Sequence, residues 1–335
     1  MRAIDRAAPL RYWTTLGNGK MIEAVRSALK SMKDPVLISR SDPVMSTMVA
    51  LKCRKYASKW IAHFSDVMPF GHFGRLGGIM RWCVRRMVLR TIIEADAVAV
   101  TCENAKRWFI EKYSIGDKEG LVDKFLVCRH IGTPVLAPVP DRIPAMPFGK
   151  GKVISHCGYL GRDRYVDEIS VALAEVARRR DIVFSMIGGF SKATVDSFQR
   201  KGVKTDSVLC DDPGMTTRVN ENSDVLLVAD TDPVDVEYSP FLPSKFVYAL
   251  YTDTPIVACS TEDSEMFKLA RQFPDAGIYC GNVHSPESLA SAVETALDRG
   301  RMQGEDRRKL RECFSEKYVI GTYLRDLERL GISES

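Results

Sequence analysis

The segment Gly158-Tyr-Leu-Gly-Arg-Asp-Arg164 has the residue types of a phosphate-binding loop. Gly158 and Gly161 let the backbone approach a ligand closely, and Arg162 and Arg164 can pair with phosphate oxygens. The segment also precedes an expected helix, whose N-terminus favours an anion. A turn with solvated arginines has the same sequence pattern, so this segment alone leaves both interpretations open.

A second candidate is the segment 240–246, which places Ser244 and Lys245 at the start of an expected helix, behind a proline. A hydroxyl, an ammonium group and free backbone N–H groups at one helix start favour an anion, although a plain capped helix has the same pattern. Gly188 and Gly189 follow another expected strand and allow either a ligand-binding turn or a simple strand end.

The sequence lacks several standard nucleotide and catalytic motifs. It contains no G-x-G-x-x-G, no G-x-x-x-x-G-K-[ST] and no G-x-S-x-G, which argues against a nicotinamide dehydrogenase, a P-loop hydrolase and an α/β-hydrolase. Its nine cysteines form no C-x-x-C pair and its five histidines are scattered. No metal site is therefore expected, and the cysteines are interpreted as small apolar side chains in a reducing compartment.

The second half of the chain alternates short apolar strands with amphipathic helices, the pattern of a doubly wound parallel sheet. Ser285 and Pro286 suit the start of the last helix of this run, and Gly300 suits its end. The expected strands are 152–157, 181–187, 207–210, 224–229, 255–259 and 277–280. The expected helices are 166–176, 191–201, 243–252, 264–273 and 286–299.

The first half is of the same α/β kind, with expected strands at 36–39, 60–64, 97–101 and 125–128. Five prolines between residues 134 and 147 predict a linker, because proline at this density fits neither a helix nor a central strand. The fold class predicted is α/β with two Rossmann-like domains. The predicted division is residues 1–135, a linker at 136–152, residues 153–305, and a C-terminal helix at 306–335 that can pack back on the first domain.

Composition is that of a globular protein, with 45% hydrophobic and 27% charged residues. No apolar run approaches the ~20 residues of a spanning helix, and the N-terminus has no apolar signal-peptide core, so the cytoplasm is the expected location. Residues 1–115 hold 20 basic and 9 acidic residues, whereas the rest holds 28 and 34. This asymmetry favours an anionic partner for the first half.

Much of that basic charge lies in residues 75–90, which contain five arginines and no acid. In a helix, Ile79, Met80, Val84, Met87 and Val88 would share a face around Trp82 and Cys83, with Arg81, Arg85 and Arg86 largely apart from it. Such a helix suits an anionic membrane surface, although a core helix with a solvated basic side has the same pattern. Aromatic residues are not interleaved with this charge as in a nucleic-acid-binding module, so nucleic acid is not expected.

Taken together, these segments resemble glycosyltransferases of the GT-B fold, of the group 1 or family 4 type, from about residue 35 to 300. The strongest likeness is Leu242-Pro-Ser-Lys245 with the following residues to Ala258, which is similar to the family's L-P-S-K-x-x-E-Y stretch. The glycine loop 158–164 resembles the family's diphosphate-binding loop. Residues 60–66 are similar to its W-I-x-x-x-R-D-P-W stretch, and residues 95–103 to its A-D-x-V-x-x-x-S-E stretch.

The resemblance implies that the second half binds a nucleoside-diphosphate sugar and the first half a glycan or lipid-linked acceptor, as in polysaccharide biosynthesis. Arg164 and Lys245 would hold the diphosphate and act as catalytic residues, with His63 as a further catalytic candidate. The implied donor-binding residues are Gly158, Gly161, Arg162, Arg164, Gly188, Ser244, Lys245 and Tyr248. Such enzymes typically retain the anomeric configuration and need no metal or other cofactor, and lipid-linked acceptors favour a peripheral place on the inner membrane face.

Two departures from the family pattern keep other functions open. Tyr248 stands where the family often has a ribose-binding glutamate, and Pro240 where it has a partner glutamate, with Glu237 out of register. No opening strand or glycine loop is recognisable before residue 20, so by analogy the first domain is expected to lack its N-terminal part. The alternatives are a catalytically impaired sugar-nucleotide-binding protein and a GT-B sugar-nucleotide epimerase.

Overall fold

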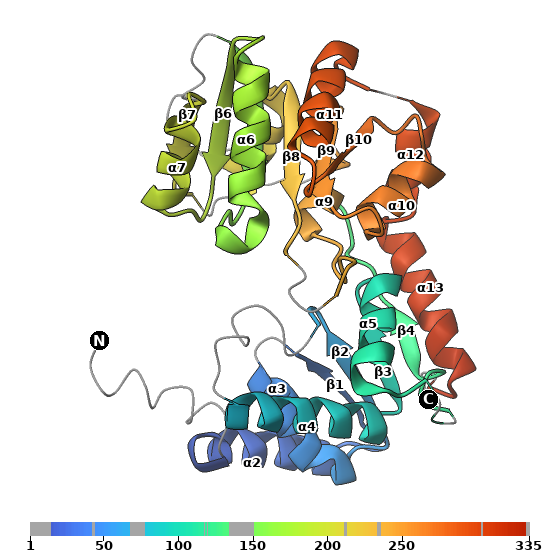
Figure 1. Ribbon diagram of the computed structural model, residues 1–335. Helices are drawn as coiled ribbons and strands as arrows, with labels where there is room; N and C mark the ends of the chain where they lie inside the picture. The colour runs from blue at the N-terminus through green and yellow to red at the C-terminus, as the bar shows by residue number, and fades with distance from the viewer. Residues whose placement is uncertain are drawn as a thin grey trace. The chain divides into compact units, whose positions relative to one another are not determined.

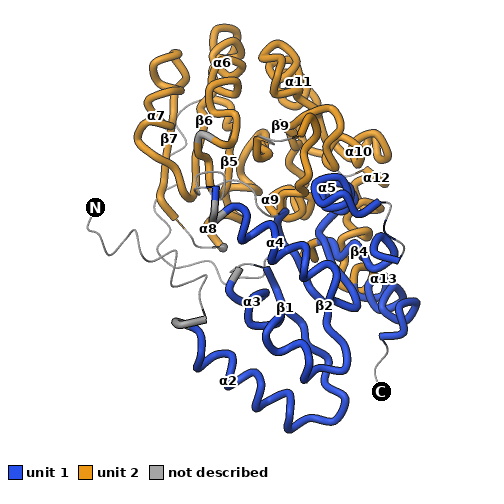
Figure 2. Tube along the Cα trace, turned by 60° about the horizontal axis from the view of Figure 1, so that its bottom comes forward, with its two compact units in different colours: residues 1–129, 320–335 blue, residues 130–319 orange. Residues whose placement is uncertain are grey.

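The computed structural model describes residues 15–41, 44–67, 78–116, 118, 120–133, 151–210, 213–232, 236–302 and 304–332. The chain forms two compact units, shown in Figure 2. Unit 1 comprises residues 1–129 and 320–335, and unit 2 comprises residues 130–319. The predicted linker lies outside the described residues, apart from its last two positions, Gly151 and Lys152.

Unit 1 contains a four-stranded parallel sheet in the order β1-β2-β3-β4. The predicted strands are all present, with bounds that differ by only one residue. Its strands are β1 (Val36–Arg40), β2 (Lys59–Phe64), β3 (Ala97–Val100) and β4 (Phe125–Val127). Its helices are α2 (Thr15–Ser31), α3 (Val44–Cys53), the 3-10 turn η1 (Arg54–Tyr56), α4 (Gly78–Glu94) and α5 (Glu103–Tyr113).

Helices cover the two faces of this sheet to different extents. On one face, α2 and α3 pack together through buried side chains that include Ile22 and Val49, and α5 places Phe109 4.9 Å from Phe64, centroid to centroid. On the other face, helix α13 (Glu316–Arg329), which belongs to unit 1 from residue 320, contributes Leu327 against Ile61. The edge strand β1 stays partly uncovered on that second face, because its Ile38 is 64% exposed.

Unit 2 contains a six-stranded parallel sheet in the order β10-β9-β8-β5-β6-β7. The order reverses between β5 and β8, the place at which doubly wound sheets bind ligands beyond their carboxyl ends. Its strands are β5 (Lys152–Cys157), β6 (Ile182–Ile187), β7 (Lys204–Val208), β8 (Val225–Ala229), β9 (Ile256–Ser260) and β10 (Ile278–Asn282).

Helices lie on both faces of the unit 2 sheet (Figure 1). A core cluster joins one face to α6 (Val166–Ala177), α7 (Lys192–Gln199) and α11 (Pro286–Arg299). On the other face, α8 (Pro213–Asn222) packs through Met215 and Val219 against Ile187. The remaining elements are the turn η3 (Arg162–Arg164) and helices α9 (Ser244–Ala249), α10 (Glu265–Gln272) and α12 (Glu305–Glu312). The Ser285 side chain caps α11 and Gly300 ends it, as predicted.

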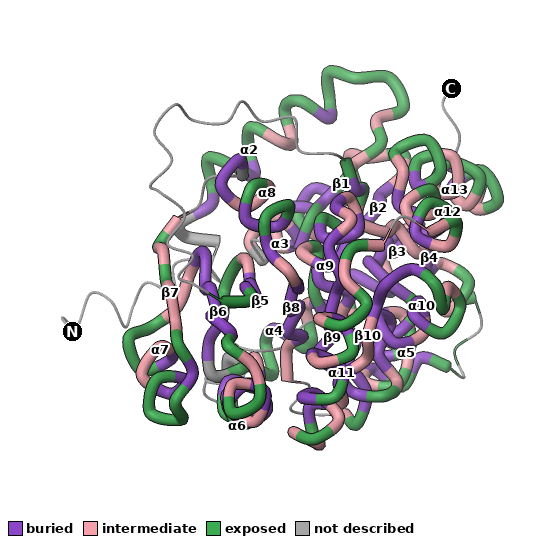
Figure 3. Tube along the Cα trace, turned by 90° about the horizontal axis from the view of Figure 1, so that it is seen from above, coloured by how far each residue is buried: buried purple, intermediate pink, exposed green. Residues whose placement is uncertain are grey.

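Three predicted elements need correction, and one helix was not predicted. The strand predicted at 207–210 is β7, which spans residues 204–208 and is a polar edge strand. In Figure 3 it is more exposed than its neighbour β6, which is buried throughout. Helix 243–252 is the six-residue α9, and the expected single C-terminal helix is divided into α12 and α13. Helix α8 was not predicted, because it places only Met215 and Val219 on its buried face. In each case the apolar pattern was too short to fix the element's bounds.

Candidate active site

The loops after β5 and β6 form one closely packed pair at the carboxyl edge of the unit 2 sheet. The amide of Gly158 donates to the Ile187 carbonyl at 2.7 Å, and that of Leu160 donates to the Gly189 carbonyl at 2.8 Å. Gly158 and Gly188 have φ angles of 106° and 119°, which side-chain-bearing residues rarely adopt. A Cβ at Gly188 would lie 2.9 Å from the Gly158 Cα, so the pair of loops requires glycine there.

Arg164 extends from the turn η3 towards the end of the central strand β8. Its Nη1 donates to the Ala229 carbonyl at 3.1 Å. Its Nε is buried and has no hydrogen-bond partner among the described residues. The guanidinium is thus held at the carboxyl edge of the sheet with donor capacity left for a ligand, because arginine carries five N–H donors.

Lys245, on the first turn of α9, extends to the glycine loop. Its Nζ lies 3.2 Å from His156 Nε2 and 3.2 Å from the Tyr159 carbonyl oxygen. A Cβ at Gly158 would lie 3.5 Å from the same Nζ, in ordinary van der Waals contact, so the ammonium group lies directly beside the loop. Arg164 and Lys245, predicted from separate segments, therefore both lie at one edge of the sheet.

Burial, and to a smaller extent the positive charge of Arg164, lower the pKa of Lys245 to about 7, whereas Asp230 and Asp163 act in the opposite direction. The two cations are thus near enough to repel each other. Two positive charges held together at a water-poor edge favour a bound anion, because the anion would relieve that repulsion. The arrangement suits a ligand with two neighbouring phosphates.

Asp230 is a buried carboxylate directly after β8. It accepts hydrogen bonds from Ser260 Oγ at 2.7 Å and from the Thr231 amide at 2.8 Å, and burial raises the pKa of its carboxyl group. A further hydrogen bond, from Ser239, reaches the loop that leads into α9. Asp230 therefore links the end of the central strand to the segment that carries Lys245.

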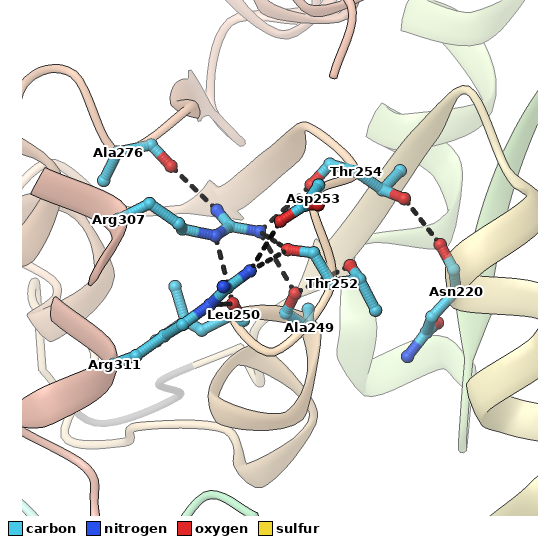
Figure 4. A network of polar contacts seen from close by, with 9 residues as sticks. All are labelled: Asn220, Ala249, Leu250, Thr252, Asp253, Thr254, Ala276, Arg307 and Arg311. Carbon is cyan, nitrogen blue, oxygen red and sulfur yellow. Dashed lines mark hydrogen bonds and ion pairs between the residues drawn. The ribbon is translucent and has the colours of Figure 1, made fainter. Parts of the chain in front are cut away.

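The opposite end of α9 is held by two arginines of α12, shown in Figure 4. Arg307 is 1% exposed. Its guanidinium donates to five carbonyl oxygens, those of Ala249, Leu250, Thr252, Thr254 and Ala276. Arg311 donates to the Thr252 carbonyl at 2.8 Å and pairs with Asp253 at 2.9 Å. These bonds satisfy the carbonyl end of a short helix, which would otherwise be an unstable support for Lys245.

Other predicted site residues take less definite places. Ser244 is exposed at the first position of α9, and Tyr248 is 43% exposed on the same helix. Gly161 precedes η3, in which Arg162 is the first residue. His63 lies near the carboxyl end of β2, in unit 1.

Sequence reasoning missed His156 and Asp230. His156 lies inside β5 and is fully buried, and Asp230 directly follows an all-apolar strand. A polar residue inside or directly after a buried strand must find partners, and this was the available signal. This signal was not used, because the segments that contain His156 and Asp230 were interpreted only as buried strands and the loops after them.

Residues 78–90 of the basic segment lie in α4, whereas residues 75–77 lie outside the described residues, and the predicted apolar face is buried only in part. Val84 and Val88 are fully buried within unit 1, whereas Trp82 is 58% exposed and Cys83 is also exposed. The guanidinium of Arg86 lies 5.4 Å from the centre of the Trp82 ring. Val84 and Val88, which were predicted to face a membrane, are therefore part of the core of unit 1.

Searches by sequence are uninformative, since no protein-family model and no curated protein matches the chain. Solved structures do match. A trehalose-phosphate synthase (UDP-forming) from Burkholderia vietnamiensis aligns with a TM-score of 0.66 at 12% identity, over 99% of this chain and 79% of its own. Anabaena HepE, solved with UDP and glucose, aligns with a TM-score of 0.65 at 13% identity, over 95% and 83%. The galactosyltransferase WaaB aligns with a TM-score of 0.63 at 12% identity, over 94% and 81%.

The chain has the GT-B fold. Its parallel four-stranded and six-stranded sheets match those neighbours, and the first domain is the smaller one. An epimerase also matches: the UDP-GlcNAc 2-epimerase from Neisseria meningitidis aligns with a TM-score of 0.51 at 11% identity, over 93% of this chain and 80% of its own. Within the described ranges, no helix meets the length and hydropathy of a membrane span, and no three His, Cys, Asp or Glu side chains form a metal-binding group.

Proposed function

We propose that this GT-B chain is a glycosyltransferase that moves a sugar from a nucleoside-diphosphate sugar to a glycan or lipid-linked acceptor, with retention of configuration and without a metal. The observation that carries the proposal is the pair Arg164 and Lys245 at the glycine loops. The resemblance in the segment from Leu242 to Ala258 supports the same assignment.

The chemistry explains why two cations are needed. In sugar transfer the bond between the anomeric carbon and the β-phosphate oxygen breaks, and its electron pair leaves with the nucleoside diphosphate. Negative charge therefore grows on the diphosphate in the transition state, and cations already in place stabilise it without reorganisation. Lys245 and Arg164 would supply this charge, and the glycine backbone at residue 158 would let the phosphates come close.

Binding of UDP tests the donor site directly. Replacing Lys245 or Arg164 with alanine should weaken UDP binding roughly 10- to 100-fold, since a hydrogen bond to a charged group contributes about 1.5–3 kcal/mol. Lys204→Ala is the matched control, because this lysine is 65% exposed on β7, where it pairs with Asp181. Calorimetric titration with UDP and with uridine measures the effect, and uridine should bind all four proteins alike. Equal UDP affinity in parent and Lys245→Ala protein would contradict the proposal.

Tyr248 favours a second candidate, a sugar-nucleotide-binding protein with little catalytic activity. This side chain stands where the family resemblance implies a ribose-binding glutamate, and it cannot provide a carboxylate. Release of UDP from UDP-glucose and UDP-galactose, with and without glycan acceptors, separates the two functions. Tight UDP binding without release in any combination would favour the binding protein.

An epimerase is the third candidate, because a UDP-GlcNAc 2-epimerase shares the fold. It would need acids or bases that converge on the sugar ring, and no such set was recognised in the sequence. Incubation with UDP-GlcNAc, followed by separation of the C2 epimers, tests this alternative. The same assays repeated with EDTA test the proposed independence from metals, for which unchanged activity is expected.

Peripheral association with an anionic membrane through residues 75–90 stays part of the proposal in a weaker form. Because Val84 and Val88 are buried, the side chains left to contact the membrane are Trp82 and the exposed arginines beside it. Sedimentation with anionic and neutral vesicles tests it. Binding should be confined to anionic vesicles and should disappear at 1 M salt, where the Debye length falls to about 3 Å.

A further inference from the structure

His156 is a fully buried imidazole inside β5, next to the candidate diphosphate site, and both of its ring nitrogens have polar neighbours. Nδ1 lies 3.0 Å from the Leu227 carbonyl oxygen of the adjoining strand β8. Nε2 lies 3.2 Å from Lys245 Nζ and 3.2 Å from the Tyr159 carbonyl oxygen. A histidine needed only to join two strands would not require the contact with Lys245.

These contacts select one protonation state of the ring. Each ring nitrogen faces a carbonyl oxygen, but Nε2 also faces the Lys245 ammonium group, which can only donate, so Nδ1 carries the proton and donates to Leu227. Nε2 of the neutral ring is then an acceptor, and the only donor among its described neighbours is the Lys245 side chain. Burial lowers the pKa of His156 well below its usual value, and the charge of Lys245 lowers it further, which keeps the ring neutral.

We propose that His156 is a positioning residue, whose Nε2 holds the Lys245 ammonium group at the glycine loop so that it meets a bound diphosphate. The inference rests on the proposed function. An ammonium group has three donors, of which two are directed to Nε2 and to the Tyr159 carbonyl. The third has no partner among the described residues and is available for a phosphate oxygen. The contact with Nε2 also favours the charged form of Lys245, against the burial that disfavours it.

The charge state of Lys245 makes this role measurable. The charged and titratable groups around it are Arg164 and Asp163 on η3, Cys157 and His156 at the end of β5, and Asp230 after β8. Because the pKa of Lys245 is about 7 in the empty site, affinity for a diphosphate should fall as pH rises above that value. UDP-glucose is the suitable probe, since its diphosphate is a diester with no proton to exchange near neutral pH.

Two substitutions separate positioning from strand joining. His156→Asn keeps a side-chain donor at the level of Nδ1 for Leu227, but its amide oxygen is too short to take the place of Nε2 as the acceptor for Lys245. His156→Gln places an amide oxygen at the level of Nε2. We expect His156→Asn to weaken UDP binding roughly 5- to 30-fold, less than the loss of the Lys245 ammonium group itself, and His156→Gln to recover most of it. The pH at which UDP-glucose affinity begins to fall should shift downwards in His156→Asn.

A double-mutant cycle completes the test. In the Lys245→Ala background, His156→Asn should have no further effect on UDP affinity, because the residue through which it acts is missing. If His156→Asn binds UDP like the parent while Lys245→Ala does not, the positioning role is wrong and the proposed function stands. If the parent binds neither UDP nor UDP-glucose, the proposed function fails, and this inference with it. Should His156→Asn not fold, weak UDP binding by a folded His156→Gln protein would overturn the inference.

Discussion

The two sheets of this chain differ in the side chains that their exposed edge strands carry. Unit 2 buries every residue of its strands β6, β8 and β9, and its exposed edge strand β7 is polar. In unit 1 the inner strand β3 is also fully buried, but edge strand β1 leaves the apolar side chains of Val36 44% and Ile38 64% exposed. Parallel sheets are normally covered on both faces. The polar cluster around Arg164, Lys245 and Asp230 lies in unit 2, and the described residues of unit 1 form no comparable cluster.

The largest expected effect concerns the support of the unit 2 site. Replacing Arg307 with methionine should destabilise unit 2 by at least about 3 kcal/mol, because several buried carbonyl oxygens would lose their donor at once. Denaturant unfolding measures this loss. The control is Arg308→Met on the same helix, whose side chain is 64% exposed, and it should cost less than about 0.5 kcal/mol. Equal effects of the two substitutions would show that the buried guanidinium does not support α9.

A smaller effect is expected at the paired glycine loops. Gly188→Ala should cost about 2–3 kcal/mol, because strain at positive φ adds to a collision with the Gly158 backbone. Gly202→Ala is the matched control, since Gly202 also has a positive φ, of 85°, but a Cβ there would have open space around it. It should cost about 1 kcal/mol. Thermal unfolding and UDP titration of both variants check this, and similar losses would mean that backbone strain alone matters.

The sequence predicted most elements of both sheets because their strands are short apolar runs bounded by turn residues. It also predicted Gly158, Arg164 and Lys245, because cations and glycines at strand ends have a recognisable chemistry. It missed Arg307 and His156, whose roles depend on residues distant in the sequence. Arg307 lies on a strongly polar helix, where an arginine looks solvated, and only tertiary packing brings the carbonyl groups of residues 249–254 and 276 around it.

A third prediction uses the pH dependence of unit 2. In the folded protein the pKa of Lys245 is about 7, so this side chain is about half charged at pH 7. In the unfolded chain a lysine stays protonated up to about pH 10.4. The unfolded chain therefore binds more protons between these values, so this group makes stability rise as pH increases from 7 to 10. After allowance for partial exposure to water, the rise should be about 1–2 kcal/mol. Unfolding of the parent and of Lys245→Met at several pH values measures it, and an identical slope in the two proteins would contradict the lowered pKa.

The smallest effect is expected at the open edge of unit 1. Ile38→Lys should change the free energy of unfolding by less than about 0.5 kcal/mol, because the side chain is already largely in water. Ile61→Lys is the matched comparison: Ile61 pairs with Ile38 in the sheet, on the same face, yet is only 2% exposed. It should cost more than about 3 kcal/mol, because it would bury an unpaired charge. Denaturant unfolding of both variants gives the two values. A loss above about 1.5 kcal/mol for Ile38→Lys would mean that this face is covered in solution, which would make the unit 1 sheet resemble that of unit 2.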